Sequence, residues 1–254
     1  MNSIFKKARP SGLGNVASGF MLFVLSGAGL SLAIGTASAG EDPYVYYGIN
    51  FEQFEYRLGA EKDLLVWDGD AFVGTDEVKL RLRSSGDYSL DDSAFEALEH
   101  QGLVQVPVSD FFDAKAGLRY DSPVGENRGY AVLGFQGLAP QWFEVEGDVY
   151  LSEKGDVSAR LEVDYELLLT NRLILTPTAE IDVAFSDDAQ TGVGSGLSSI
   201  ETGLRLSYDL VGRSIAPYVG VNYERSFGQT KDYAREDGEA ADDVALVAGV
   251  RLLF

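Results

Sequence analysis

Apolar and charged residues alternate almost without interruption between residues 137 and 185, with the two-residue period of a β-strand. In the first of three such runs Phe143, Val145 and Val149 share one face, and acidic residues occupy the other. The next two runs repeat this pattern. Such strands form either one layer of a soluble sandwich or the wall of a membrane barrel, with lipid outside and charges lining the lumen.

The turn between the first two runs determines which residues face each other. A three-residue hairpin loop over 153–155, with Gly155 in the left-handed conformation, pairs Ser152 with Asp156. Counting inward from that pair, acids face acids at two positions: Glu146 with Glu162 and Glu144 with Asp164. Because facing carboxylates repel each other, we expect at least one of these carboxyl groups to have a raised pKa, or Arg160 or a bound cation to bridge them.

The same alternation divides residues 44–254 into about twelve runs, an even number as in bacterial membrane barrels. We expect strands near 44–58, 64–73, 78–86, 94–106, 112–121, 129–137, 142–151, 157–169, 173–185, 200–210, 216–227 and 244–254. Compact connections such as GTDE, PVSD and TN alternate with longer ones such as GDYSLDD and GQTKDYAREDGEAADD. This pattern is typical of an all-β, transmembrane, antiparallel up-and-down β-barrel with short periplasmic turns and longer extracellular loops.

The last run, VALVAGVRLLF, places alternate apolar residues on one face and ends at the aromatic Phe254. A long apolar edge strand would promote aggregation of a soluble protein, whereas closure of a barrel removes the edge. The run resembles the terminal strand that bacterial barrel-assembly machinery recognises, so we expect that machinery as a partner. Outer-membrane lipid should contact a girdle of outward aromatic residues, namely Tyr120, Phe143, Phe185, Tyr208 and Phe227.

Residues 1–39 have the pattern of a cleaved secretory signal peptide. Basic residues lie at positions 6, 7 and 9, an apolar stretch covers 20–34, and an Ala-Ser-Ala cleavage site ends at Ala39. A membrane anchor is the alternative, but the apolar stretch is short and interrupted by glycines. We therefore expect a signal peptide over 1–39 and one barrel over 40–254, exported to the cell outer membrane.

The composition restricts the chemistry that the chain can perform. Cysteine is absent, so neither disulfides nor thiolate ligands are available. The formal net charge of −20 argues against a nucleic-acid partner. His100 is the only histidine and no nucleophile motif adjoins it, so we expect no enzymatic activity.

Six blocks, in order along the chain, carry a resemblance to a known family: INFEQFEYRLG, LLVWDGDAFVG, the stretch from GYAVLGFQGLAP to NRLILTP, GSGLSSIETGLRLSYDL, APYVGVNYERSFG and VAGVRLLF. Together they resemble the copper resistance protein B family of outer-membrane proteins. The resemblance implies a β-barrel in Gram-negative bacteria that serves copper homeostasis by binding copper ions or easing their passage. It also implies a periplasmic multicopper oxidase as a partner.

The chain departs from this family at one point that matters for copper. Many members carry a Met- and His-rich segment before the barrel, whereas here only residues 41–43 separate the leader from the first strand. Both methionines, Met1 and Met21, lie in the leader region. Copper ligands would therefore come from lumen carboxylates and the single histidine, and the candidates are Glu144, Glu146, Glu162, Asp164, Glu166, Glu180, Asp182 and His100.

Two alternatives for the acidic lumen remain open. The carboxylates can be neutralised across the lumen by basic residues on the third and fifth strands, namely Lys79, Arg81, Arg83, Lys115 and Arg119. They can also attract cations without copper specificity, as in a general porin-like barrel, because carboxylates are hard ligands that discriminate poorly for copper. A structural or adhesin-like barrel that uses its acidic loop over 229–243 is a further possibility.

Overall fold

The computed structural model describes residues 44–59, 62–122, 127–238 and 240–254. The predicted signal peptide over 1–39 lies outside these residues and stays a prediction. Within them, no helix is both long enough and apolar enough to cross a membrane.

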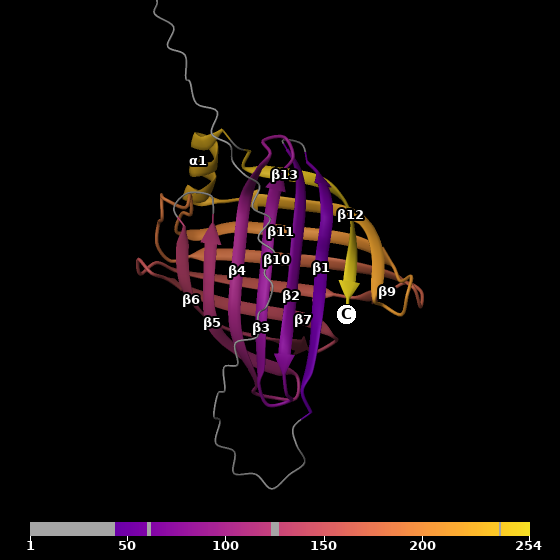
Figure 1. Ribbon diagram of the computed structural model, residues 1–254. Helices are drawn as coiled ribbons and strands as arrows, with labels where there is room; N and C mark the ends of the chain where they lie inside the picture. Colours follow the sequence, from indigo (N-terminus) through magenta and orange to yellow (C-terminus); the bar gives the residue numbers. More distant parts are fainter. Residues whose placement is uncertain (1–43, 60–61, 123–126, 239) are drawn as a thin grey trace, which may run out of the picture. The chain divides into compact units, whose positions relative to one another are not determined.

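Antiparallel strands that pair in chain order form the barrel (Figure 1). The last strand pairs with the first, so the sheet closes on itself. The strands are β1 (Tyr46–Leu58), β2 (Asp63–Gly74), β3 (Lys79–Ser89), β4 (Ala94–Pro107), β5 (Phe112–Ser122), β6 (Arg128–Ala139), β7 (Phe143–Ser152), β8 (Val157–Tyr165), β9 (Leu167–Leu168), β10 (Leu173–Ala184), β11 (Gly196–Tyr208), β12 (Ile215–Ser226) and β13 (Asp242–Leu253).

The short β9 continues β8 after an interruption, and both pair with β10, so the described chain forms a twelve-stranded wall. In Figure 1 the near-wall strands β1 to β4 cross the far-wall strands β7, β10 and β11. This crossing is the tilt that closure of a barrel requires. The predicted architecture is confirmed, and the strand ends agree with the predicted ones within a few residues.

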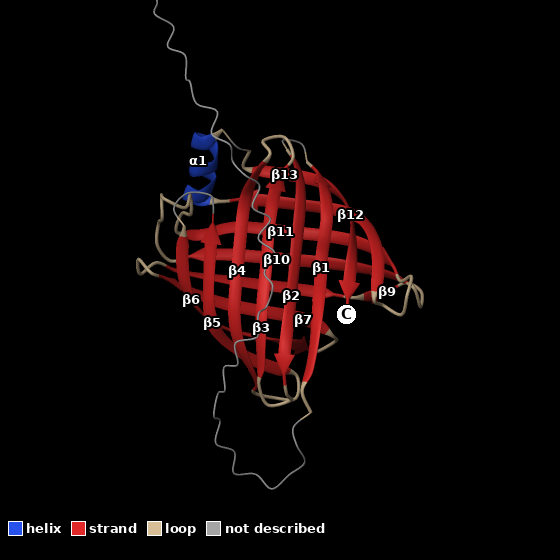
Figure 2. Ribbon diagram, viewed as in Figure 1, coloured by secondary structure: helices blue, strands red, loops and turns tan. Residues whose placement is uncertain are grey.

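One element was not predicted. The helix α1 (Gly228–Asp237) lies in the long connection between β12 and β13 (Figure 2). It ends at Gly238, which adopts the left-handed conformation with φ of 89° and donates its backbone N–H to Arg235 O. The sequence of this segment has no apolar stripe, so its periodicity did not indicate a helix.

The barrel wall is apolar outside and charged inside. On β5 the outward Leu118 is 70% exposed, whereas the inward Lys115 is 2% exposed. Outward leucines and valines follow the same phase on the other strands, as contact with lipid requires. Of the five predicted girdle aromatics, Tyr120, Phe143, Phe185 and Tyr208 are exposed, whereas Phe227 is half-buried at the start of α1.

The closure between β1 and β13 is reinforced from inside by a buried carboxylate. Glu55 on β1 accepts hydrogen bonds from Arg57 Nε at 2.7 Å, from Arg205 Nε at 3.0 Å and Nη2 at 2.9 Å, and from Tyr218 Oη at 2.8 Å. Gly249 on β13 pairs with both Glu55 and Tyr218. A Cβ atom at Gly249 would lie 2.7 Å from Glu55 Cβ and from Tyr218 Cζ, so this position requires glycine.

We expect Gly249→Ala to destabilise the folded barrel by about 1–3 kcal/mol, because the added methyl group overpacks the Glu55 cluster. Gly102→Ala is the matched control, since its Cβ would meet only Leu82 Cδ2, at 3.8 Å. Urea unfolding in detergent, followed by heat-modifiable electrophoretic migration, measures both variants. Equal stability of the two variants would contradict the packing assigned to Gly249.

Candidate functional site

The turn between β7 and β8 has the geometry expected from the sequence. Asp156 O accepts the backbone N–H of Ser152 at 2.8 Å, and Gly155 has a φ of 94°. The register that follows confirms both predicted acidic pairs, Glu146 with Glu162 and Glu144 with Asp164.

The first of these pairs belongs to a longer row. One inward glutamate from each of five neighbouring strands lies in register with the next, and we call this set the glutamate row: Glu146 on β7, Glu162 on β8, Glu180 on β10, Glu201 on β11 and Glu224 on β12. Like charges that face each other across strands destabilise a sheet unless cations intervene. The position of the basic side chains therefore decides whether this wall is stable.

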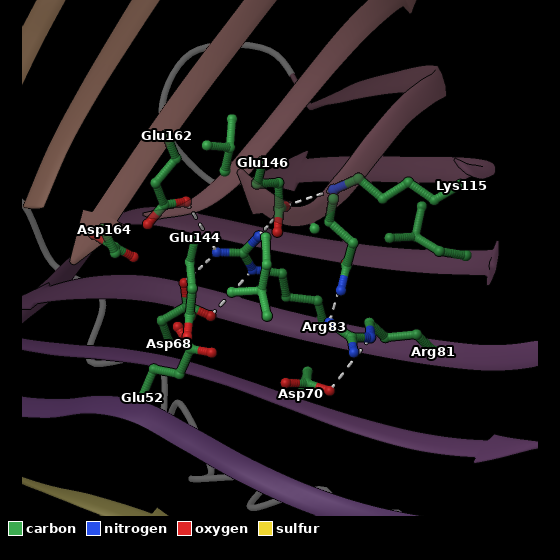
Figure 3. A pocket seen from close by; sticks show the side chains of 15 residues that line it. Glu52, Asp68, Asp70, Arg81, Arg83, Lys115, Glu144, Glu146, Glu162 and Asp164 are labelled. Carbon is green, nitrogen blue, oxygen red and sulfur yellow. Dashed lines mark hydrogen bonds and ion pairs between the residues drawn. The ribbon is translucent and has the colours of Figure 1, made fainter. Parts of the chain in front are cut away.

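Arg83 supplies the bridge between the facing acids of β7 and β8. It extends from β3 to the opposite wall, where Nη1 lies 2.6 Å from Glu146 and Nη2 lies 3.7 Å from Glu162 (Figure 3). Nη2 also lies 2.6 Å from Asp68 on the neighbouring strand β2. Arg160 was the arginine that the sequence suggested for this bridge, and the structure corrects it to Arg83.

Arg160 neutralises a different part of the lumen. Its Nε lies 3.0 Å from Glu180 and 2.9 Å from Asp182, both on β10. Its Nη1 lies 3.7 Å from Glu99 on β4, across the lumen. The strand register explains the difference, because Arg160 pairs directly with Asp182 on β10 and so reaches Glu180 of the row rather than the Glu146–Glu162 pair.

The other basic residues named from the sequence also meet acids inside the barrel. Lys115 Nζ lies 2.5 Å from Glu146 and 2.8 Å from Asp148. Lys79 pairs with Asp113 at 3.4 Å and Arg81 with Asp70 at 3.5 Å, while Arg119 pairs with Glu99 at 2.9 Å and with Asp121 at 2.7 Å. The expected neutralisation of the acidic wall is therefore found for Arg83 and Lys115, whereas Lys79, Arg81 and Arg119 pair with acids on β2, β4 or β5.

Carboxylates nevertheless remain in excess around a central cavity of about 290 Å³. Its lining includes three arginines, Arg57, Arg83 and Arg160. Eight carboxylates face them: four members of the glutamate row, Glu162, Glu180, Glu201 and Glu224, together with Asp68, Asp87, Glu99 and Asp182. Acidic side chains therefore outnumber basic ones in the lining of this part of the lumen.

Three further cavities lie on either side of the central one. A loop-end cavity of about 430 Å³ reaches Thr191 and Thr230 in the long connections. A turn-end cavity of about 260 Å³ contains Glu52, Glu144 and Asp164 (Figure 3), and a rim cavity of about 220 Å³ reaches Glu166.

The loop end is covered by two connections that pack on each other. Gly194, in the connection between β10 and β11, donates its backbone N–H to Thr230 Oγ1 on α1 at 2.9 Å. Within the same connection, the Ser195 backbone N–H donates to the Asp187 carboxylate at 2.7 Å, and this hydrogen bond lowers the pKa of Asp187. The covering segments are thus held by specific contacts.

The structure brings the seven candidate carboxylates into one lumen but does not bring His100 to them. Glu166 lies near the turn end, where Arg251 Nη1 is 2.6 Å away. His100 is exposed on β4, in a depression of the outer face beside Trp67 and Ser84. The candidate set therefore divides into an acidic lumen and an isolated outward histidine.

Several residues that line the lumen were not predicted from the sequence. Asp68, Asp87, Glu99 and Glu224 line the central cavity but were not named as candidates. For Asp68, the sequence did contain an indication of its inward position. Residues alternate in the WDGD stretch of β2, which places Asp68 and Asp70 on one face. On β4 the signal was hidden by a register shift beside Glu96, which sets Glu99 inward and His100 outward.

Among the described residues, no group of three or more His, Cys, Asp or Glu side chains is arranged to hold a metal ion. Several of the lumen carboxylates pair with arginines instead.

A closed sheet, an apolar outer face and a charged lumen together define a membrane β-barrel of the outer-membrane type. The model of the family "Copper resistance protein B precursor (CopB)" matches residues 45–254. The chain belongs to this family.

Two relatives agree with this assignment. A copper resistance protein B homolog of Pseudomonas syringae pv. tomato is 42% identical over 203 residues, which are 80% of this chain and 68% of the relative. Copper resistance protein B of Escherichia coli is 36% identical over 213 residues, which are 84% of this chain and 71% of the relative.

Comparison with solved structures finds porins at low identity. The KdgM porin has a TM-score of 0.46 at 11% identity, covering 81% of this chain and 98% of that one. The NanC porin has a TM-score of 0.49 at 10% identity, covering 82% of this chain and 99% of that one.

We expect Glu146→Gln to destabilise the barrel by about 3 kcal/mol, because Arg83 and Lys115 would each lose a partner inside the lumen. Glu144→Gln is the control on the same strand and face, since Glu144 forms no ion pair within 4.0 Å among the described residues. Chemical unfolding in detergent measures both variants. A Glu146→Gln barrel as stable as Glu144→Gln would show that the bridge does not stabilise the fold.

Proposed function

We propose that this barrel serves copper resistance by drawing copper ions into its acidic lumen and easing their movement along it, without a catalytic step. The observation that carries the proposal is the central cavity, where eight carboxylates face three arginines. A cavity of one charge sign inside low-dielectric walls raises the local concentration of counter-ions. Membership of the copper resistance protein B family is the reason for proposing copper as the cation.

The cavities form a series from one end of the barrel to the other, because each shares lining residues with the next. The loop-end and central cavities share, among others, Glu99, Arg160 and Glu224. The central and turn-end cavities share Asp68, Arg83 and Glu162, and the turn-end and rim cavities share Glu52, Glu144, Glu162 and Asp164. Acidic residues thus accompany an ion along the whole series.

The ligand chemistry supports attraction rather than tight capture. Carboxylates are hard ligands, whereas Cu(I) prefers thioethers and thiolates. Residues 44–254 contain neither methionine nor cysteine, and the one histidine faces outward. The lumen therefore favours weakly held Cu(II), and tight capture belongs to a partner.

The ends of the barrel have different roles in this proposal. The end with α1 and the long connections faces the outside of the cell, and the end with the short turns faces the periplasm, as in outer-membrane barrels. Outer-membrane lipid covers the apolar wall, and the barrel-assembly machinery engages β13. A periplasmic multicopper oxidase receives copper at the turn end.

A general cation-attracting barrel is the second candidate. The observation that favours it is the absence of soft ligands from the lumen, since carboxylates alone discriminate poorly between copper and other cations. Deletion of the gene separates the two functions. Copper tolerance or cell-associated copper changes more than zinc tolerance if the barrel serves copper, whereas uptake of unrelated solutes falls with copper unchanged if it is a general porin.

We expect the double variant Asp87→Asn/Glu224→Gln to lower cation over anion permeability on the order of tenfold, because two lumen charges are removed. Neither residue forms an ion pair within 4.0 Å among the described residues, so the fold should keep its stability. Reversal potentials in planar bilayers and the copper content of complemented deletion cells measure the effect.

Asp232→Asn/Glu236→Gln on the exposed face of α1 is the matched control, since it removes the same charge outside the cavities. It should behave like the wild type. Equal effects of the two double variants would mean that overall charge, and not the lumen, attracts cations.

A further inference from the structure

We propose that Arg83 and Arg160 are two barriers in series that set the rate and the charge preference of passage through the lumen. The inference rests on the proposed passage of cations. Each arginine joins opposite walls of the barrel, and each stands where two cavities meet. The carboxylates attract cations, and these two guanidinium groups decide how easily the cations pass.

Arg83 separates the central cavity from the turn-end cavity, since it lines both. Its guanidinium contacts Asp68 on its own wall and Glu146 and Glu162 on the other, at distances of 2.6 to 3.7 Å. The view in Figure 3 shows this side chain lying across the cavity between the two sets of carboxylates. A cation moving between the two cavities has to pass this fixed positive charge.

Arg160 occupies the equivalent position between the central and loop-end cavities, both of which it lines. It contacts Glu180 and Asp182 on the neighbouring strand β10 and Glu99 on β4 across the lumen. The central cavity is therefore bounded by an arginine on each side, while its own wall is acidic.

Arginine suits this role because its guanidinium stays protonated and its planar fork holds two carboxylates at once. A fixed positive charge in a pore is an electrostatic barrier to cations. A cation that enters competes with the guanidinium for the same carboxylates. Because Coulomb repulsion scales with the charge of the ion, both barriers hinder divalent cations more than monovalent ones.

Two barriers in series give a distinctive response to mutation. Removing one leaves the other in place, so Arg83→Gln or Arg160→Gln alone should raise the single-channel conductance in potassium chloride by less than about threefold. Removing both should raise it on the order of tenfold or more, because unit charges a few ångströms apart in a protein interior change an equilibrium by at least that factor. The double variant should also become more permeable to Ca²⁺ relative to K⁺, because the carboxylates that the arginines neutralised become available to the divalent ion.

Arg81→Gln is the matched control. Arg81 lies on the same strand and face as Arg83 and carries the same charge, but it pairs with Asp70 and lines only the turn-end cavity of the four lumen cavities. Its conductance should remain that of the wild type. A rise in Arg81→Gln equal to that in the double variant would overturn the proposal, because net charge would then explain the effect.

Loss of an arginine can also impair folding, so charge-neutral variants accompany the test. Arg83→Gln/Glu146→Gln leaves Lys115 paired with Asp148, and Arg160→Gln/Asp182→Asn removes a directly facing pair. The four substitutions combined should conduct like the double arginine variant. Wild-type conductance and wild-type Ca²⁺ preference in a folded barrel with these four substitutions would overturn the proposal.

These measurements use the full barrel and potassium or calcium chloride without copper, so they are independent of the copper assignment. Raised conductance of the Arg83→Gln/Arg160→Gln variant, together with unchanged copper tolerance in a strain that lacks the gene, would support the two barriers and refute the copper role. Unchanged conductance together with lost copper tolerance would refute the barriers and support the copper role.

Discussion

Ion pairing across the lumen is the interaction on which this barrel depends. Lipid requires an apolar outer face, and because side chains alternate along a strand, polar residues are directed inward. Four of the five facing glutamates on one wall are paired with basic side chains: Glu146 and Glu162 with Arg83, Glu180 with Arg160, and Glu201 with Arg57. These ion pairs offset the repulsion that facing carboxylates would otherwise cause in a narrow closed sheet. The same principle applies at the barrel closure. There Glu55, which pairs with Gly249, accepts hydrogen bonds from Arg57, Arg205 and Tyr218.

Local rules were sufficient to predict the wall but not the contacts across it. The two-residue period and the turn at Gly155 predicted the strands and the facing pair Glu146 and Glu162, because both depend on neighbouring strands alone. The partner of that pair depends on which distant strand lies across the lumen, which follows from strand tilt and stagger. Periodicity carries no such information, so Arg160 was predicted where Arg83 lies.

Deviations from regular alternation account for the remaining differences. The register shift beside Glu96 changes the phase of β4, so that the only histidine faces away from the acids near it in sequence. The helix α1 has no apolar face and is held instead by tertiary contact with Gly194. One feature is a local irregularity of a strand and the other depends on a tertiary contact, and a pattern of hydrophobic positions indicates neither.

The imbalance of charge in the lumen is the strongest sign of function. Buried ion pairs offset the cost of placing charges inside a protein, and each further unpaired carboxylate adds repulsion. A barrel that needed only stability would match its eight central carboxylates with basic residues, yet the cavity has three arginines. Sites where a sequence departs from the most stable solution are commonly functional. The excess carboxylates therefore fit a lumen that draws in cations, while the arginines that stabilise the wall also limit their passage.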